Sequence, residues 1–234
     1  MKKNIAVILA GGSGLRLGSK LPKQFISIAG KTLIEYTINT FQKTNSIDEI
    51  AIIINKNYFS EIENIIENNK FTKVKKILPG GKDRNGSSLS AINAYKTEKN
   101  SKNINLIFHD AVRPLITCNI IENVVNALKK HNAVDVAIPA TDTILELDKN
   151  GFIKNIPNRK HLRISQTPQA FNLNTIKIAY EKALQDSNFK TTDDCSVVLN
   201  YLKDEKIFIV EGSETNIKIT YKSDLLLFNN LLKQ

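Results

Sequence analysis

The stretch Asn4–Phe25, NIAVILAGGSGLRLGSKLPKQF, places a short apolar run directly before a loop rich in glycine and positive charge. Residues Ile5–Ala10 predict a buried β-strand, because a continuous apolar run of this length that ends in glycines is typical of one. The loop after it carries Gly11, Gly12, Gly14, Arg16, Gly18, Lys20 and Lys23. Such a loop suits an anionic ligand, because glycine N–H groups and cationic side chains can both face it.

The segments that follow alternate between strand-like and helix-like patterns. Strands are predicted at Ile5–Ala10, Glu49–Ile54, Val74–Leu78, Ile104–His109 and Ala133–Pro139, and helices at Thr32–Phe41, Phe59–Asn68, Ser87–Lys96 and Asn119–Lys130. Parallel strands need crossover connections, which are usually helical. We therefore expect an α/β fold with a mostly parallel sheet and helices on both faces, and a ligand site at the carboxyl ends of the strands.

The last third of the chain adds further elements to a single domain over residues 1–234. Helices are predicted at Leu173–Leu184, Asp193–Leu202 and Ser223–Leu232, and strands at Ile207–Val210 and Asn216–Thr220. Residues 141–158 form two short alternating runs around Asn150 and Gly151, which predicts a β-hairpin. This hairpin either projects as an arm that pairs with another subunit or lies flat on its own domain.

Composition limits the classes of partner. The chain has 234 residues, 41% of them hydrophobic, which is enough for a sizeable core. Its net charge of +10 could indicate a polyanion, but no dense Lys/Arg tract is interleaved with aromatic residues, so a small anionic substrate is favoured over nucleic acid. No apolar segment reaches the length of a membrane span or a signal sequence, and we expect a cytoplasmic protein that does not bind membranes.

The two cysteines do not indicate a metal or disulfide site. Cys118 and Cys195 lie far apart, with no CxxC motif and no histidine cluster nearby. Neither a zinc site nor a disulfide framework is therefore predicted. We expect both to be ordinary core thiols.

Three kinds of phosphate-binding loop compete for the first glycine segment. A Walker A loop needs Gly-Lys-[Ser/Thr], whereas Gly18-Ser19-Lys20 has the wrong order. A dinucleotide fingerprint needs G-x-G-x-x-G, and Gly12, Gly14 and Gly18 are spaced one residue too far, although Glu35 lies at a suitable distance for its acidic residue. A long loop that closes over a nucleoside triphosphate is the remaining hypothesis.

Six motifs occur in a characteristic order along nearly the whole chain: LAGGSGLRLG with KLPKQF, GGKDRNGS, HDAVRP, QTPQAF and NIKITYKSDL. In these motifs the chain resembles the cytidylyltransferases that join CTP to polyol phosphates. The resemblance implies a Rossmann-like nucleotidyltransferase sheet, attack of the acceptor phosphate on the α-phosphorus of CTP, a requirement for Mg²⁺, and a homodimer formed through the 141–158 arm.

The same resemblance assigns roles to individual residues. Catalytic cations are Arg16, Lys23 and Lys218, and the metal-binding carboxylate is Asp110. Nucleotide binding falls on Ala10, Gly11, Gly12, Gly14, Gly80, Gly81, Asp83, Arg84 and Ser87. Acceptor binding falls on Arg113, Thr143, Arg159 and Thr167, of which Thr143 and Arg159 are expected to serve the partner's site. Read without the resemblance, Asp83, Ser87 and Asp110 could be helix caps, and the three catalytic cations could be surface charges.

The sequence motifs specify the acceptor substrate less closely than they specify the reaction. Four stretches resemble the branch of the family that acts on D-ribitol 5-phosphate: VDVAIPATDTI, QTPQAF, Thr192–Cys195 and GSETNIKITY. Ser165, at a position where the family frequently has glycine, could alter the acceptor pocket. We predict cytidylyl transfer to D-ribitol 5-phosphate, with 2-C-methyl-D-erythritol 4-phosphate as the alternative acceptor. An NAD(P)-binding oxidoreductase and a catalytically silent binding module remain as distant alternatives.

Overall fold

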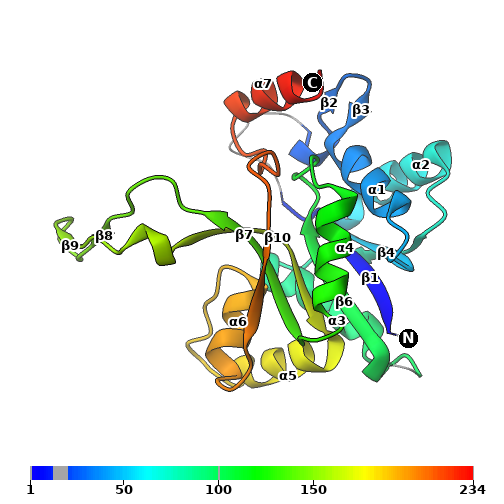
Figure 1. Ribbon diagram of the computed structural model, residues 1–234. Helices are drawn as coiled ribbons and strands as arrows, with labels where there is room; N and C mark the ends of the chain where they lie inside the picture. Colours follow the sequence, from blue (N-terminus) through cyan, green and yellow to red (C-terminus); the bar gives the residue numbers. More distant parts are fainter. Residues whose placement is uncertain (1, 13–20, 100, 234) are drawn as a thin grey trace.

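A seven-stranded sheet forms the centre of the computed structural model, which describes residues 2–12, 21–99 and 101–233 (Figure 1). Its strands are, in spatial order, β11 (Ile207–Glu211), β7 (Ala133–Pro139), β10 (Arg163–Asn172), β6 (Ile104–Asp110), β1 (Lys3–Leu9), β4 (Glu49–Ile54) and β5 (Val74–Pro79). Only β10 runs antiparallel to its neighbours, β6 and β7. The other pairs are parallel, which confirms the expected α/β fold.

Helices cover both faces of this sheet. One face carries α1 (Leu33–Lys43), α2 (Phe59–Asn69) and α4 (Cys118–Ala127), and the other carries α3 (Arg84–Tyr95), α5 (Leu173–Ala183) and α6 (Asp194–Tyr201). Alternate residues of β1 divide between the two cores: Ala6 and Ile8 pack on the first face, and Ile5 and Val7 on the second. A strand that is apolar on both sides is the expected consequence of burial in a doubly covered parallel sheet.

A third apolar cluster joins the last helix to the body of the domain. Helix α7 (Lys222–Leu231) buries Phe228 against Leu33, Val112 and Ile219. Figure 1 shows α7 beside the short strands β2 (Ser27–Ile28) and β3 (Lys31–Thr32), which pair with each other and were not predicted. Helix α7 therefore fixes the chain segment that precedes it near the end of β6.

Helix α3 begins three residues earlier than the sequence pattern predicts. Its first residue is Arg84 instead of Ser87, because Asp83 acts as the N-cap and its Oδ1 accepts a hydrogen bond of 2.8 Å from Gly86 N. Side-chain capping of this kind satisfies an N–H group that has no partner within the helix. The early start places the side chain of Arg84 on the first turn of the helix.

The predicted hairpin is present and projects from the body, with strands shorter than the 141–158 segment (Figure 1). Strands β8 (Glu146–Leu147) and β9 (Ile153–Asn155) pair antiparallel around a turn in which Gly151 has a φ of +88°. Asp148 Oδ1 stabilises that turn by accepting hydrogen bonds from the backbone N of Asn150 and Phe152. Phe152 is 71% exposed at its tip, so the arm leaves apolar surface uncovered in the isolated chain.

One strand was missed, and two predictions from the sequence are wrong. Strand β10 was not predicted, because Pro168 and buried polar residues break its alternation, and the register with β7 shifts at that point. Residues Asn216–Thr220 form no strand in the part of the chain that the structure describes, and the alternating Ile217 and Ile219 instead pack in the cluster that contains Phe228 of α7. Cys118 is exposed, and only Cys195 is a core thiol.

No helix among the described residues has the length and apolar character needed to cross a membrane.

Candidate active site

A cavity of about 480 Å³ opens at the carboxyl ends of β1 and β6, where the fold predicts a ligand site. It is lined by Leu9, Ala10, Gly11, Gly12, Lys23, Gln24, Asn55, Gly81, Lys82, Asp83, Arg84, Ser87, Asp110, Val112 and Lys218. Both glycine segments and the end of β6 thus meet at one place. Its volume lies within the range of roughly 300–1,000 Å³ that is usual for small-molecule sites.

The second glycine segment is folded tightly onto the start of α3. Ser87 Oγ accepts a hydrogen bond of 3.1 Å from Gly81 N and donates one of 2.9 Å to Asp83 O. A Cβ atom on Gly81 would lie 2.2 Å from the carbonyl carbon of Gly86, so no larger residue fits there. Asp83 and Ser87 therefore both stabilise this turn, and both still line the cavity.

The first glycine segment contacts the second one directly. A Cβ atom on Gly11 would lie 3.3 Å from Ser87 Oγ. Gln24, which is 3% exposed, donates a hydrogen bond of 2.7 Å to Ala10 O from the far end of the loop. Gly14 and Arg16, to which the sequence assigns nucleotide binding and catalysis, lie outside the described residues.

Asp110 is the centre of a cluster of cations. Its Oδ1 lies 2.7 Å from Arg84 Nη1, and its Oδ2 lies 2.7 Å from Lys218 Nζ and 3.9 Å from Arg113 Nε. Burial alone would raise the pKa of this carboxyl, but Arg84 and Lys218 outweigh burial and hold the pKa far below its ordinary value. Asp110 is thus an anion at any physiological pH.

Lys218 and Lys23 approach the cavity from opposite ends of the chain. Lys218 extends from the unpaired segment 216–220, and its side chain is 45% exposed despite the contact with Asp110. Lys23 Nζ donates a hydrogen bond of 3.2 Å to the carbonyl oxygen of Ile219, next to Lys218. The structure therefore brings two of the three predicted catalytic cations together.

A chain of hydrogen bonds lies behind Asp110. Thr167 Oγ1 accepts from Asp110 N at 3.1 Å and donates to His109 Nδ1 at 3.0 Å, while His109 Nε2 donates to Arg113 O at 3.2 Å. His109 is completely buried, and burial lowers its pKa to about 4. It is therefore neutral near pH 7, in keeping with the expectation that His109 is a structural neighbour of the site.

The residues predicted to bind the acceptor are dispersed in the single chain. Thr167 is 4% exposed, and its hydroxyl is engaged as described above. Arg113 Nη1 donates a 2.7 Å hydrogen bond to Asn216 O, which ties the turn after β6 to the segment that carries Lys218. Thr143 and Arg159 are exposed at the base of the arm, where Arg159 Nη1 donates to Thr141 O. None of these four lines the cavity among the described residues.

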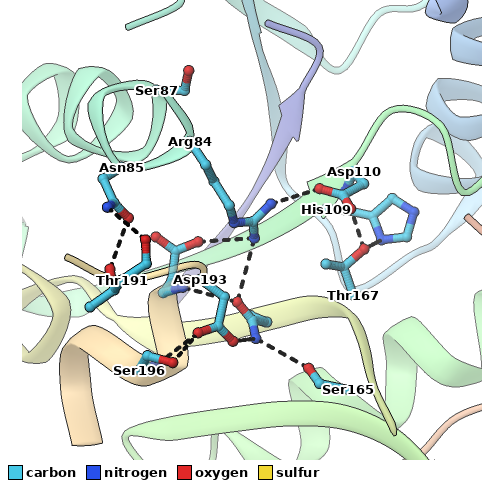
Figure 2. Close-up of polar contacts among 12 residues, drawn as sticks. Arg84, Asn85, Ser87, His109, Asp110, Ser165, Thr167, Thr191, Asp193 and Ser196 are labelled. Carbon is cyan, nitrogen blue, oxygen red and sulfur yellow. Dashed lines mark hydrogen bonds and ion pairs between the residues drawn. The ribbon is translucent and has the colours of Figure 1, made fainter. Parts of the chain in front are cut away.

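A polar network that includes Asp193 and Ser165 was not predicted from the sequence, and part of it is visible in Figure 2. Gln169 Nε2 donates to Asp193 Oδ2 at 2.6 Å and to Asp135 Oδ1 at 3.3 Å, and Ser165 Oγ donates to Asp135 Oδ2 at 2.9 Å. Ser165 Oγ thus contacts Asp135 and also the carbonyl oxygen of Gln166, the residue before Thr167. Burial raises the pKa of Asp135 to about 6 despite these hydrogen bonds. The only signal in the sequence was the polar character of strand β10.

Asp110 can be tested as the predicted Mg²⁺ ligand by its chemistry. Mg²⁺ prefers one or two carboxylates together with substrate phosphates and water. No group of three or more Asp, Glu, His or Cys side chains within the described ranges could form a metal cage. Asp110 lines the cavity as one ionised carboxylate, whose Oδ1 contacts Arg84 and whose Oδ2 contacts Lys218. Its donor set therefore fits a metal ion held mainly by phosphates.

Comparison with known proteins identifies a family and several relatives of this chain. The sequence model of the family described as "IspD: 2-C-methyl-D-erythritol 4-phosphate cytidylyltransferase" matches residues 4–234. A protein from Thermobifida fusca (strain YX), named 2-C-methyl-D-erythritol 4-phosphate cytidylyltransferase, is 40% identical over 97% of this chain and 92% of its own length.

Two further relatives are a bifunctional protein compared by sequence and a crystal structure compared by fold. The bifunctional ribulose 5-phosphate reductase/CDP-ribitol pyrophosphorylase Bcs1 of Haemophilus influenzae is 48% identical over 99% of this chain, which spans 48% of that protein's length. The crystal structure of 4-diphosphocytidyl-2C-methyl-D-erythritol synthase from Anaerococcus prevotii superposes with a TM-score of 0.85 and 32% identity, covering 100% of this chain and 97% of that one.

Proposed function

The chain belongs to the IspD family of cytidylyltransferases, and from this premise we propose that it transfers a cytidylyl group from CTP to D-ribitol 5-phosphate, with release of pyrophosphate. The observation that carries the reaction is the cavity in which Lys23, Lys218 and Asp110 meet the two glycine segments. The relative with 48% identity, whose name includes CDP-ribitol pyrophosphorylase, supports ribitol phosphate as the acceptor.

In the proposed reaction a phosphate oxygen of the acceptor attacks the α-phosphorus of CTP. A new P–O bond forms, the bond between the α-phosphorus and the bridging oxygen breaks, and that oxygen leaves with pyrophosphate. A phosphate monoester loses its second proton near pH 6, so the nucleophile is already anionic at pH 7. It needs no general base, which agrees with a neutral, buried His109.

The chain's own contribution is positive charge held in place. Two anions must meet, and charge accumulates on the α-phosphate and on the departing pyrophosphate. Lys23 and Lys218 are proposed to stabilise that charge, together with Arg16. Mg²⁺, when bound beside Asp110, supplies further positive charge to the phosphates. Asp110 also holds Lys218 Nζ at 2.7 Å at the edge of the cavity, ready to contact a phosphate.

Base recognition is proposed for the backbone around Gly81. The cavity wall there consists of Gly11, Gly81 and Ser87, which leave room for close approach of a planar ring. The Ser87 hydroxyl is already committed to Gly81 N and Asp83 O. Its proposed contribution is therefore to shape the loop, with a second lone pair still available to a ligand.

The acceptor site is proposed to be completed by a second copy of the chain. Thr143 and Arg159 lie at the base of an arm with exposed apolar residues, and they do not line the cavity of their own chain. Co-expressed Arg16→Ala and Arg159→Ala chains should then form heterodimers with one intact site, whereas each variant alone is inactive. Inactive heterodimers would refute the shared site.

The alternative acceptor is 2-C-methyl-D-erythritol 4-phosphate, which several relatives of 39–40% identity carry in their names. The deciding experiment is pyrophosphate release from CTP and Mg²⁺ with each polyol phosphate in parallel. We expect kcat/KM for D-ribitol 5-phosphate to be at least 10-fold higher than for 2-C-methyl-D-erythritol 4-phosphate, since an active site can discriminate between two similar substrates through very few contacts. The opposite ratio would refute ribitol phosphate and leave the reaction type unchanged. The family match leaves no support for an oxidoreductase.

A further inference from the structure

We propose that Arg84 is a positioning residue, which fixes the carboxylate of Asp110 from a second, fully buried carboxylate, Asp194 on α6. This inference rests on the proposed cytidylyl transfer, in which Asp110 holds Lys218 at the cavity. It changes the role predicted for Arg84 from the sequence, where it was assigned to nucleotide binding. Asp194 itself lies outside the cavity lining and carried no predicted role.

The guanidinium group of Arg84 bridges two carboxylates from different elements (Figure 2). Its Nη1 lies 2.7 Å from Asp110 Oδ1 at the end of β6, and its Nη2 lies 3.1 Å from Asp194 Oδ2 at the start of α6. The planar fork of arginine is suited to such bridging, because its two terminal nitrogens point in fixed directions. Both terminal nitrogens are thereby engaged within the protein.

Asp194 is a firm anchor for this bridge. It is 0% exposed, and its Oδ1 accepts a hydrogen bond of 2.7 Å from the hydroxyl of Tyr180 on α5. Its backbone N donates to Gln169 Oε1 at 3.2 Å, which ties it to strand β10 as well. A buried carboxylate with this many partners has few alternative orientations, so Arg84 is held from a fixed point.

A second set of contacts holds the helix that carries Arg84. Asn85 Nδ2 donates to Thr191 O at 3.3 Å, and Thr191 Oγ1 donates back to Asn85 Oδ1 at 3.2 Å. The first turn of α3 is therefore joined to the segment before α6 independently of the charged bridge. Loss of the bridge should leave the loop from Gly81 to Ser87, and hence CTP binding, in place.

The bridge determines which oxygen of Asp110 is left for the cavity. With Oδ1 committed to Arg84, Oδ2 is directed to Lys218 Nζ at 2.7 Å. Without Arg84, the carboxylate would be free to rotate, and Lys218 would lose its fixed partner. Because small displacements of catalytic groups and of the residues that orient them cost roughly 10- to 100-fold in rate, the effect should appear in kcat.

The test compares Arg84→Lys and Asp194→Asn with the wild type. The lysine keeps the positive charge but has one nitrogen, so it cannot join both carboxylates. Each variant should lose at least 10-fold in kcat, while the dissociation constant for CTP in the absence of metal changes less than 3-fold. The double variant should lose no more than the worse single variant, because both substitutions break the same bridge. Tyr201→Phe on α6, which removes only a surface hydrogen bond to Asp186, is the matched control and should keep wild-type kcat.

Each alternative outcome is distinguishable. A rise in the CTP dissociation constant in Arg84→Lys, with kcat unchanged, would show that Arg84 binds nucleotide directly. A lower melting temperature with unchanged kcat at 20 °C would show a structural role only. A wild type inactive with both acceptors would refute the proposed function. Crystal structures of the wild type and Asp194→Asn then test the bridge alone, and an unchanged Arg84–Asp110 contact in the variant would overturn the proposal.

Discussion

Replacement of Asp110 by asparagine removes the negative charge that Arg84 and Lys218 share. The side chains are nearly equal in size, so the substitution changes charge with little change in packing. Arg84 and Lys218 would each lose an ionic partner at 2.7 Å, and one of them would face the new amide N–H₂ group. The variant should be less stable at pH 7 and should lose most of its turnover.

The loss of stability can be estimated from the exposure of each contact. Hydrogen bonds to charged groups contribute about 1.5–3 kcal/mol when the partners are shielded from water. The contact with Arg84, whose side chain is 23% exposed, falls in this range. The contact with Lys218, which is 45% exposed, is weakened by solvent and adds at most about 1 kcal/mol. A total of about 3 kcal/mol corresponds to a decrease in melting temperature of roughly 6–12 °C for a domain of this size.

Thermal unfolding followed by circular dichroism at several pH values is the appropriate assay. The folded-state pKa of Asp110 lies far below the unfolded value of about 4, so the stabilisation is present above pH 4 and is lost as the pH falls further. The difference in melting temperature between the wild type and Asp110→Asn should therefore become smaller below pH 4. Asp186→Asn, on an exposed carboxyl bonded to Tyr201, is the control and should shift the melting temperature by about 1 °C or less. An Asp110→Asn variant that melts within 2 °C of the wild type at pH 7 would refute the reasoning.

Three further predictions concern other parts of the site. Lys23→Ala should lower kcat at least 100-fold with an unchanged circular dichroism spectrum, because Lys23 is proposed to stabilise phosphate charge; near-normal kcat would remove it from the mechanism. Gly81→Ala should lower the melting temperature and weaken CTP binding, because its Cβ would meet Gly86 at 2.2 Å, whereas the melting temperature of Gly12→Ala, with no atom within 4 Å, should not change. The pKa of Asp135 is about 6 in the folded chain and about 4 in the unfolded chain, so the folded state loses free energy of unfolding as the pH rises from 4 to 6. Asp135→Asn should thus gain up to about 3 kcal/mol over the wild type between pH 4 and pH 7, and equal pH dependence of the two melting temperatures would contradict this.

The sequence predicted the parts of the fold that depend on local periodicity. The strands Glu49–Ile54 and Ala133–Pro139 have the predicted bounds, because both are mostly apolar runs that the sheet buries. Strand β10 was not predicted, because its buried Gln166, Thr167 and Gln169 find their hydrogen-bond partners in distant segments: the Ser213 carbonyl oxygen and the side chains of His109 and Asp193. Partners of that kind leave no periodic signal in the chain.

The positions of the site residues were predicted from motifs, whereas the ion pairs and pKa values of the site were not. The strand-end position of Asp110 and the two glycine segments could be placed at one edge of a parallel sheet from chain order alone. The bridge from Arg84 to Asp194 could not, because the two residues are 110 positions apart and meet through side chains. Similarly, the pKa of Asp135 depends on burial among Ser165, Gln169 and Asp193, which only the folded chain brings together.

The central claim is that the acceptor's own phosphate attacks the α-phosphorus of CTP in the cavity around Asp110. The most direct measurement is ³¹P NMR of a reaction with CTP, Mg²⁺ and D-ribitol 5-phosphate whose phosphate oxygens carry ¹⁸O. The account predicts a nucleoside diphosphate ester that contains the label, together with unlabelled pyrophosphate. Label in the pyrophosphate, or no pyrophosphate with either polyol phosphate, would contradict it.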